Sequence, residues 1–211
     1  MAKTTVRIGI VGMGHVGPHA ASCLIQQGIA DEIYVCDVAE NEDKLQAEML
    51  DLYDSALFAP RQVRIYNCHD EYERLAACEV IINAAGHVHL SAESRDGELF
   101  ATVASTRSFV GRIAAAGFDG YWVDVSNPND VVTREIQRLS GLPTSHVLGT
   151  GTLLDSARLR AVLSRATGPS SQSLHAYILG EHGSTELAAC TPIPIAGKPL
   201  PGLALRPHGS V

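Results

Sequence analysis

The sequence lacks the features of a membrane-spanning, nucleic-acid-binding or disulfide-stapled protein. No stretch reaches the roughly 18 to 20 apolar residues that cross a bilayer, and the N-terminus has neither a signal-peptide core nor a cleavage site. Only three of the 16 cationic residues are lysines and the net charge is −7, a balance unsuited to phosphate neutralisation. The five cysteines never form a CxxC pair, which indicates reduced thiols. We therefore expect a cytoplasmic protein whose partners include neither nucleic acid nor a membrane.

What is present is the composition of a globular protein, with 211 residues, 45% hydrophobic and 18% charged. In the first half, short β-branched runs alternate with longer amphipathic stretches, which is typical of βαβ units in a parallel sheet. Strands are expected at residues 6–11, 32–36, 63–68, 80–84 and 121–125, with strand-like runs at 173–179 and 187–195 and no element beyond. Helices are expected at residues 18–27, 44–57, 71–77, 98–116, 131–139 and 153–166.

A glycine loop, GMGHVG, follows the first expected strand and opens the first expected helix. Gly12 permits the tight turn, Gly14 lets the backbone approach a pyrophosphate, and Gly17 lets helix and strand pack closely. Such a loop alone is weak evidence, but Asp37 lies twenty residues beyond Gly17 at the end of the second strand, where a carboxylate can bind a ribose hydroxyl. This negative charge repels the extra phosphate of NADP, so the pattern predicts NAD as cofactor.

Three later motifs supply the groups that hydride transfer to a ketone requires: SNPND, GTGTLLDSARLR and LGEHGST. His182 lies in a glycine turn, and a histidine side chain suits reversible proton transfer. Asp155 is a candidate partner that orients it, and Arg158, three residues further on the same helix, can bind a carboxylate with its guanidinium fork. Taken singly, each has a plainer interpretation, because such an Asp–Arg pair is often a surface ion pair and such a histidine a polar turn residue.

The order and spacing of these motifs resemble the L-lactate/L-malate dehydrogenase family, and most closely its L-2-hydroxyisocaproate dehydrogenase branch, over about residues 6–200. The resemblance implies that His182 is the acid/base catalyst paired with Asp155, and that Arg158 anchors the substrate carboxylate. It also implies that Asn127 contacts both nicotinamide and substrate, and that the three loop glycines and Asp37 bind NAD.

The resemblance also assigns roles to the segment at residues 87–97, the family's mobile loop. Its catalytic arginine, which polarises the carbonyl, matches Arg95; an ungapped comparison would place Leu99 there, and a solvated loop arginine is a further alternative. The specificity position falls at Leu90, which offers a second substrate carboxylate neither charge nor hydrogen bond and so favours an apolar 2-oxo acid. His87 and His89 lack carboxylate or thiol partners nearby, so we expect no metal.

The sequence departs from the family pattern in two places. Ser184 follows the GEHG motif, where the family usually has Asn or Asp. Roughly a third of the family's usual length has no counterpart, and the ending RPHGSV resembles no part of it, so a truncated C-terminus is expected. The expected fold is α/β, with a Rossmann doubly wound parallel sheet in residues 1–149 and an incomplete α+β substrate domain in residues 150–211.

These observations predict an NAD-dependent L-2-hydroxy acid dehydrogenase that acts on lactate or on 2-hydroxy acids with bulky apolar side chains. Its partner would be a small 2-oxo or 2-hydroxy acid, and it would form a homo-oligomer if the truncation permits. An inactive, truncated NAD-binding module and a malate dehydrogenase remain alternatives. A short-chain reductase is disfavoured, because no tyrosine is followed four residues later by the lysine that its chemistry uses.

Overall fold

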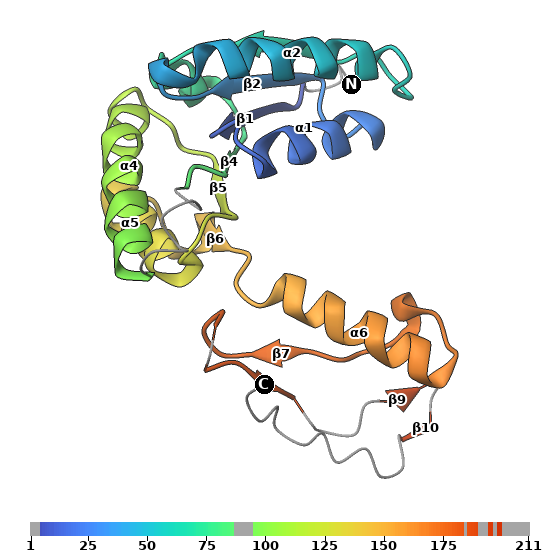
Figure 1. The fold of residues 1–211 in the computed structure, drawn as a ribbon. Helices are drawn as coiled ribbons and strands as arrows, with labels where there is room; N and C mark the ends of the chain where they lie inside the picture. Colours follow the sequence, from blue (N-terminus) through green and yellow to red (C-terminus); the bar gives the residue numbers. More distant parts are fainter. Residues whose placement is uncertain (1–4, 87–94, 184, 190–193, 196–197, 200–211) are drawn as a thin grey trace. The chain divides into compact units, whose positions relative to one another are not determined.

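The computed structural model describes residues 5–86, 95–183, 185–189, 194–195 and 198–199. The chain divides into two compact units, Met1–Gly149 and Thr150–Val211, which are considered separately below (Figure 1). Among the described helices, none has the length and apolar character needed to cross a bilayer.

The first unit is built on a six-stranded parallel sheet with the order β3-β2-β1-β4-β5-β6. Its strands are β1 (Arg7–Val11), β2 (Glu32–Cys36), β3 (Arg64–Asn67), β4 (Val80–Asn83), β5 (Tyr121–Asp124) and β6 (Val147–Gly149). The order reverses between β1 and β4, and ligands of such sheets bind outside the carboxyl ends of the strands at this switch point. The expected Rossmann doubly wound sheet is therefore confirmed.

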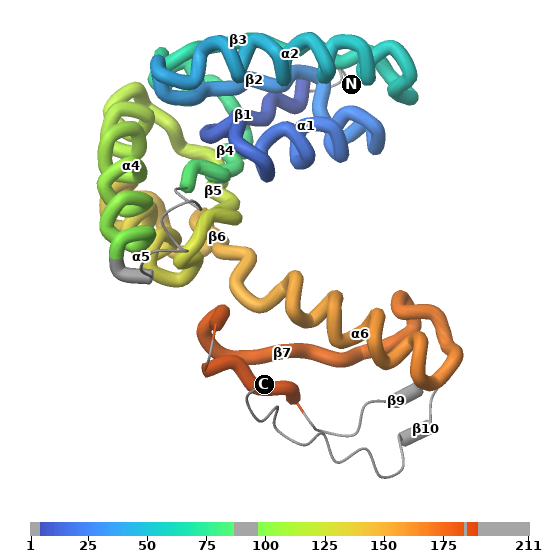
Figure 2. Tube along the Cα trace, viewed as in Figure 1, coloured from blue at the N-terminus to red at the C-terminus, as the bar shows by residue number. Residues whose placement is uncertain are grey.

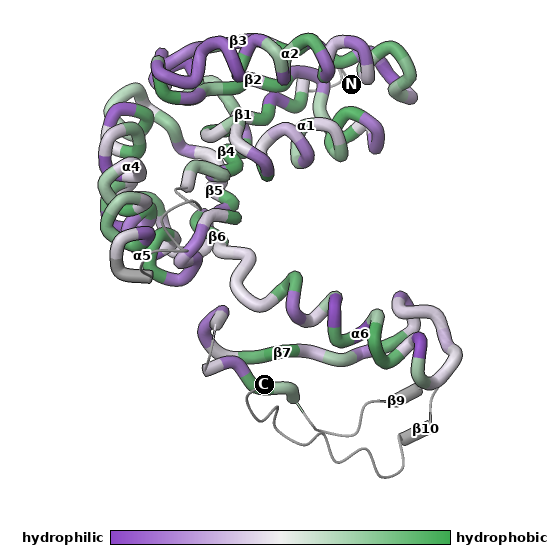
Figure 3. Tube along the Cα trace, in the orientation of Figure 1, coloured by the Kyte–Doolittle hydropathy of each residue, from purple (hydrophilic) through white to green (hydrophobic). Residues whose placement is uncertain are grey.

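Helices cover both faces of this sheet because its strands carry apolar side chains on both sides. In β2, Ile33 and Val35 pack in one core cluster with residues of α1 (Val16–Gln26) and α2 (Glu42–Ala56). Cys36 belongs to the cluster on the other face, with residues of α4 (Arg95–Ala115) and α5 (Asn129–Ser140), two helices that pack against each other (Figure 2). Hydrophilic and hydrophobic residues alternate along α2, as expected of a helix with one buried face (Figure 3).

Several elements of the first unit differ from the sequence-based expectation. Residues 71–77 form a 3₁₀ helix, η2 (Tyr72–Ala77), since so short a segment gains little from α-helical propagation. Strand β6 is not predicted, because its three residues offer no alternation to recognise. Helix α4 begins at Arg95, three residues before the expected start. Two further single turns are η1 (Ala39–Asn41) and η3 (Thr144–His146).

The second unit consists of one helix and short strand pairs. Its elements are α6 (Leu153–Thr167), η4 (Ser171–Ser173), β7 (Ile178–Leu179), β8 (Leu187–Ala188), β9 (Pro194–Ile195) and β10 (Lys198–Pro199). Strands β7 and β8 pair in antiparallel fashion, as do β9 and β10. In the run expected at 173–179, the strand is limited to β7. The run expected at 187–195 contains β8 and β9, and its residues 190–193 lie outside the described residues. Strand β10 corrects the expectation that no element follows residue 195. Leu174 and Ala176 alternate as in a strand but pack on Leu163 of α6.

The packing of α4 on the sheet gives a first testable prediction. Phe109 is 2% exposed and its ring lies 5.4 Å from that of Tyr72 and 6.4 Å from that of Trp122. We expect Phe109→Ala to lower the free energy of unfolding by about 3–5 kcal/mol, because it leaves a cavity in this core. Urea denaturation followed by fluorescence of Trp122, the single tryptophan, measures the change.

The matched control lies on the same helix, where Phe100 is 72% exposed. Phe100→Ala should change the free energy of unfolding by less than about 0.5 kcal/mol. Equal losses in the two variants would contradict the packing described here.

Candidate active site

The glycine loop lies at the carboxyl end of β1, beside the end of β4. Gly12 has a φ of 90°, a left-handed conformation, and its amide donates to the Cys36 carbonyl oxygen at 2.9 Å. A Cβ at Gly12 would lie only 2.6 Å from the backbone of Ala85. Both the conformation and the close approach therefore require glycine here.

The other two glycines of the loop have different surroundings. A Cβ at Gly17 would overlap the carbonyl oxygen of Gly12, so Gly17 holds α1 close to the loop. A Cβ at Gly14 would meet nothing within 4 Å, so space is open beside the loop where α1 begins. Helix N-termini attract anions, and the first turn of α1 contains no acidic residue that would compete. Open space at a helix N-terminus fits the pyrophosphate of a dinucleotide.

Asp37 is 7% exposed and is held at the end of β2 by three hydrogen bonds. Its Oδ2 accepts from the Met13 amide at 2.7 Å, and its Oδ1 accepts from the Val38 amide at 2.7 Å and from Asn41 Nδ2 at 3.1 Å. A carboxylate offers about four acceptor positions, so these bonds leave room for a ribose hydroxyl. The bond to the glycine loop is a second role for Asp37 that its spacing alone does not predict.

Lys44 is a residue near the loop that the sequence analysis does not single out. Its Nζ donates to the Gly14 carbonyl oxygen at 3.1 Å from the exposed face of α2. A cation beside the open space at Gly14 would favour an anionic ligand. The sequence signal that could have pointed to Lys44 is the rarity of lysine, because the chain has only three.

Asn127 lies in the turn that joins β5 to α5, on the same edge of the sheet. Its side chain is exposed, whereas Ser126 on one side and Asn129 on the other are buried. The peptide bond between Asn127 and Pro128 is cis. The turn therefore presents Asn127 from a buried support at the carboxyl edge of the sheet.

The second unit brings His182 and Asp155 together, although they lie 27 residues apart. His182 Nδ1 is 2.7 Å from Asp155 Oδ2, and both side chains are largely covered. His182 lies in a tight turn after β7, in which Gly180 and Gly183 have φ values of 102° and 149°. This geometry suits an acid that orients an imidazole for proton transfer through its other nitrogen.

Hydrogen bonds between the start of α6 and β7 fix the relative position of this pair. Thr152 Oγ1 donates to the Ile178 carbonyl oxygen at 2.7 Å, and the Ile178 amide donates to Ser156 Oγ at 2.9 Å. Asp155 lies on α6 between Thr152 and Ser156, and His182 follows β7 by three residues. We call these contacts the α6–β7 clasp.

Three further residues are predicted to belong to the site: Arg158, Arg95 and Leu90. Arg158 Nη1 lies 3.2 Å from Asp155 Oδ1, and the arginine side chain is 66% exposed, so it is available to a ligand from the surface. Arg95 is the first residue of α4, and Leu99, the alternative for its role, is half-buried on the same helix. Leu90 lies outside the described residues.

Glu186 is the third member of a group that the sequence analysis did not connect. Ligand atoms of Asp155, His182 and Glu186 all lie within 4.8 Å of one another. One imidazole and two carboxylates suit a divalent cation. Within this group Asp155 and His182 are joined directly by the 2.7 Å bond.

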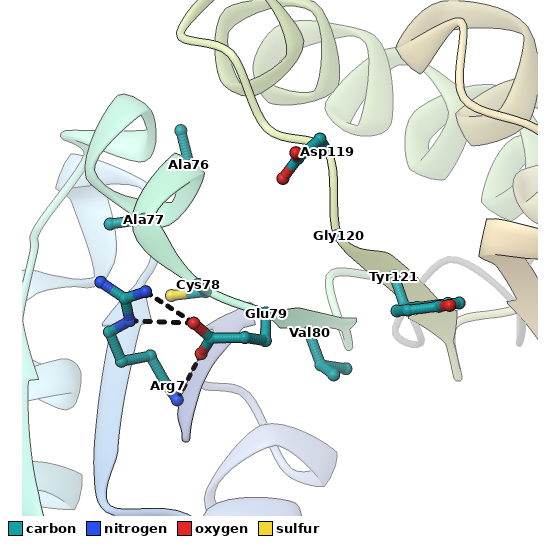
Figure 4. Close-up of a pocket in the computed structure, with 9 residues that line it drawn as sticks. All are labelled: Arg7, Ala76, Ala77, Cys78, Glu79, Val80, Asp119, Gly120 and Tyr121. Atoms are coloured by element: carbon teal, nitrogen blue, oxygen red, sulfur yellow. Dashed lines mark hydrogen bonds and ion pairs between the residues drawn. The ribbon is translucent and has the colours of Figure 1, made fainter. Parts of the chain in front are cut away.

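A separate pocket of about 470 Å³ opens at the amino ends of β1, β4 and β5 (Figure 4). Its charged lining includes Arg7 and Glu79, which are joined by side-chain contacts of 2.6 and 3.2 Å. Since ligands of doubly wound sheets bind at the carboxyl ends of the strands, this pocket is not the candidate site.

The sheet order, the glycine loop and the acid at the end of β2 define a dinucleotide-binding domain. Residues 6–149 match the NAD binding domain of lactate/malate dehydrogenase, and residues 152–204 match its alpha/beta C-terminal domain. The chain belongs to the lactate/malate dehydrogenase family, and its first unit is an NAD-binding domain, which confirms the expected family and cofactor.

Individual relatives agree with this assignment. The chain is 39% identical to an L-lactate dehydrogenase of Fusobacterium nucleatum over 195 residues, which cover 92% of this chain and 60% of the relative. It is 36% identical to L-lactate dehydrogenase 3 of Bacillus cereus, covering 95% of this chain and 62% of the relative. The crystal structure of a minor L-lactate dehydrogenase from Enterococcus mundtii superimposes with a TM-score of 0.86 at 36% identity, covering 93% of this chain and 62% of that one. The chain thus spans about 60% of the length of these relatives.

The glycine loop yields a prediction that separates ligand binding from folding. Gly14→Ala should lower NADH affinity at least about tenfold, because the methyl group would occupy the open space beside the loop, while the melting temperature should stay within about 2 °C of the parent's. Gly12→Ala should lower both, because the new Cβ would clash with Ala85. Fluorescence titration with NADH and thermal denaturation measure the two effects.

Gly111, on α4, provides the control, because a Cβ there would also meet nothing within 4 Å. Gly111→Ala should leave NADH affinity unchanged and raise stability slightly, since alanine favours a helix. Wild-type NADH affinity in Gly14→Ala would contradict the assignment of the loop.

Proposed function

We propose that this chain carries the cofactor-binding and proton-transfer residues of an NAD-dependent L-2-hydroxy acid dehydrogenase. The reaction would interconvert a 2-oxo acid and NADH with an L-2-hydroxy acid and NAD. The observation that carries the proposal is the 2.7 Å bond between His182 and Asp155, in a chain whose first unit is an NAD-binding domain of this family.

In the proposed mechanism, bound NADH supplies the hydride that reduces the 2-oxo carbon. His182 acts as the proton donor to the carbonyl oxygen, using Nε2, because Nδ1 is directed at Asp155. Asp155 would fix the ring orientation through its contact with Nδ1, which leaves Nε2 as the atom that transfers the proton. In the reverse direction the neutral ring accepts the hydroxyl proton.

Two arginines complete the proposed site. Arg158 would bind the substrate carboxylate through its guanidinium fork, with its ion pair to Asp155 limiting its orientations. Arg95 would polarise the substrate carbonyl, and Asn127 would contact the nicotinamide and the substrate from the turn after β5. Gly12, Gly14, Gly17 and Asp37 would hold the cofactor.

We propose L-lactate or a bulkier apolar 2-hydroxy acid as the substrate. The relatives described above are named L-lactate dehydrogenases, which supports the smaller substrate. Leu90 in the specificity position supports an apolar side chain and argues against malate, because a second carboxylate would be desolvated without a partner. The apolar side chain of Leu90 also supports the resemblance to the L-2-hydroxyisocaproate dehydrogenase branch.

Assembly and location are part of the same proposal. Helix α2 exposes Leu50, Tyr53 and the following Leu57, an apolar surface that supports a homo-oligomer. The described cysteines Cys23, Cys36, Cys68 and Cys78 are free thiols, which supports a reducing, cytoplasmic environment.

The acid/base assignment predicts the behaviour of His182→Asn. We expect kcat for NADH oxidation with pyruvate or 2-oxoisocaproate to fall by about 10²–10⁴, the usual contribution of general acid catalysis, with little change in NADH affinity. Stopped-flow absorbance at the NADH band and fluorescence titration measure the two quantities. His175→Asn, on an exposed residue of the same unit, should leave both unchanged.

Two other outcomes carry a definite meaning. Equal activity in His182→Asn and in the parent chain would refute the role of His182. NADH binding without turnover of any 2-oxo acid by the parent chain would instead favour the NAD-binding module.

The substrate assignment predicts a change of preference in Leu90→Arg. The parent should prefer pyruvate or 2-oxoisocaproate to oxaloacetate, and the variant should shift the kcat/KM ratio toward oxaloacetate by at least about 100-fold, because the arginine would pair with the second carboxylate. Leu90→Met, which conserves apolar character, is the control. A parent that already prefers oxaloacetate would identify a malate-type enzyme.

A further inference from the structure

A buried carboxylate lies directly beneath the turn that carries Asn127. Asp124, the last residue of β5, is 0% exposed. Its Oδ1 accepts from Ser126 Oγ at 2.6 Å and from Asn83 Nδ2 at 2.8 Å, and its Oδ2 accepts from Thr133 Oγ1 at 3.0 Å. Strands of a parallel sheet are usually apolar on both faces, so an ionisable side chain here is unexpected.

Burial and hydrogen bonding have opposite effects on the pKa of the Asp124 carboxyl group. Burial raises the pKa of Asp124, hydrogen bonds from Ser126, Thr133 and Asn83 oppose this, and the net pKa is about 6. Each of these side chains donates to the carboxylate, and such bonds favour its ionised form. The carboxylate is thus mostly ionised at neutral pH, and its partners are arranged around an acceptor.

The hydrogen bonds join two loops at the carboxyl edge of the sheet. Asn83 ends β4, and its Oδ1 accepts from the Ala85 amide at 3.3 Å, in the turn that packs against Gly12. Asn83 Nδ2 also donates to Ser126 Oγ at 3.1 Å. One side of the cluster is therefore anchored to the end of β4 through Asn83 Nδ2.

The other side of the cluster supports the turn itself. Asn129 Nδ2 donates to the carbonyl oxygens of Asp124 at 2.9 Å and of Ser126 at 3.1 Å. Ser126 and Asn129 flank the exposed Asn127, and Thr133 ties α5 to the same carboxylate. Asn127 is thus held by fixed neighbours on both sides, while its own side chain stays free to meet a ligand.

We propose that Asp124 is a positioning residue that sets the turn carrying Asn127, and so the contact of that turn with the nicotinamide half of NAD. This inference rests on the proposed function, because it takes the role of Asn127 from it. Asp124 is fully buried and would act through Ser126 Oγ and Asn129 Nδ2, which donate to its carboxylate at 2.6 and 3.3 Å. Asparagine is a poor replacement, because its NH2 group would face an amide donor whichever oxygen it replaced: Asn83 Nδ2 at Oδ1 or Asn129 Nδ2 at Oδ2.

The test compares two ligands that share the adenine half of NAD. ADP-ribose lacks the nicotinamide ring, whereas NADH carries it, so only NADH binding should depend on the turn. In Asp124→Asn, we expect NADH affinity to fall about tenfold and ADP-ribose affinity to stay within about twofold of the parent's. Isothermal titration calorimetry measures both, and circular dichroism establishes that the variant is folded.

Two further variants complete the design. Asp119→Asn makes the same substitution at an exposed position just before the other end of β5, and it should change neither affinity. Thr133→Val removes one donor to Asp124 and should lower NADH affinity about threefold without affecting ADP-ribose, a result that stands even if Asp124→Asn does not fold.

The outcomes separate this inference from the proposed function. Equal losses for both ligands, or no loss for either, in the folded variants would overturn the positioning role, as would a parent chain that does not bind NADH. A parent that binds NADH but reduces no 2-oxo acid would refute the proposed reaction, and the binding comparison would still decide the role of Asp124.

Discussion

The close approach of the Gly12 backbone to the backbone of Ala84 and Ala85 determines how the carboxyl edge of the sheet is built. It is possible because Gly12 has no Cβ and adopts a left-handed φ. The contact brings the loop after β1 against the turn after β4, at the point where the strand order reverses. Asp37 joins the same assembly from β2 through the Met13 amide. Three strands thus contribute to one cofactor edge, two through the close approach of their following loops and the third through the bond between the Asp37 carboxylate and the Met13 amide.

Much of this arrangement follows from local sequence signals. The apolar run before the glycines, the spacing from Gly17 to Asp37 and the alternation of short strands with helices specify the parallel sheet and its binding edge. These signals are strong because each depends on residues that are close in sequence. The pairing of His182 with Asp155 depends instead on tertiary contacts, and only the two motifs together suggested it.

Other parts depend on tertiary contacts that leave no mark in the sequence pattern. Strand β6 has three residues and forms because β5 offers it a partner. In the sequence, Asp124 is a polar residue near the end of an expected strand. Neither its complete burial nor the hydrogen bonds that it accepts from residues of β4 and α5 could be predicted from that. Strand β7 is shorter than the apolar run that contains it suggests, because Leu174 and Ala176 pack on α6 instead of extending a sheet.

The α6–β7 clasp bears on how the second unit maintains the geometry of His182 and Asp155. Among the described residues, the fully buried apolar core of this unit comprises Leu163, Leu174 and Ala176, a small number for fixing the position of two polar side chains from separate elements. The position of His182 relative to Asp155 is therefore set by hydrogen bonds of Thr152 and Ser156 to the Ile178 backbone. Solvent exchange of the Ile178 amide proton would report the opening of the His182–Asp155 pair from a backbone site outside the pair itself.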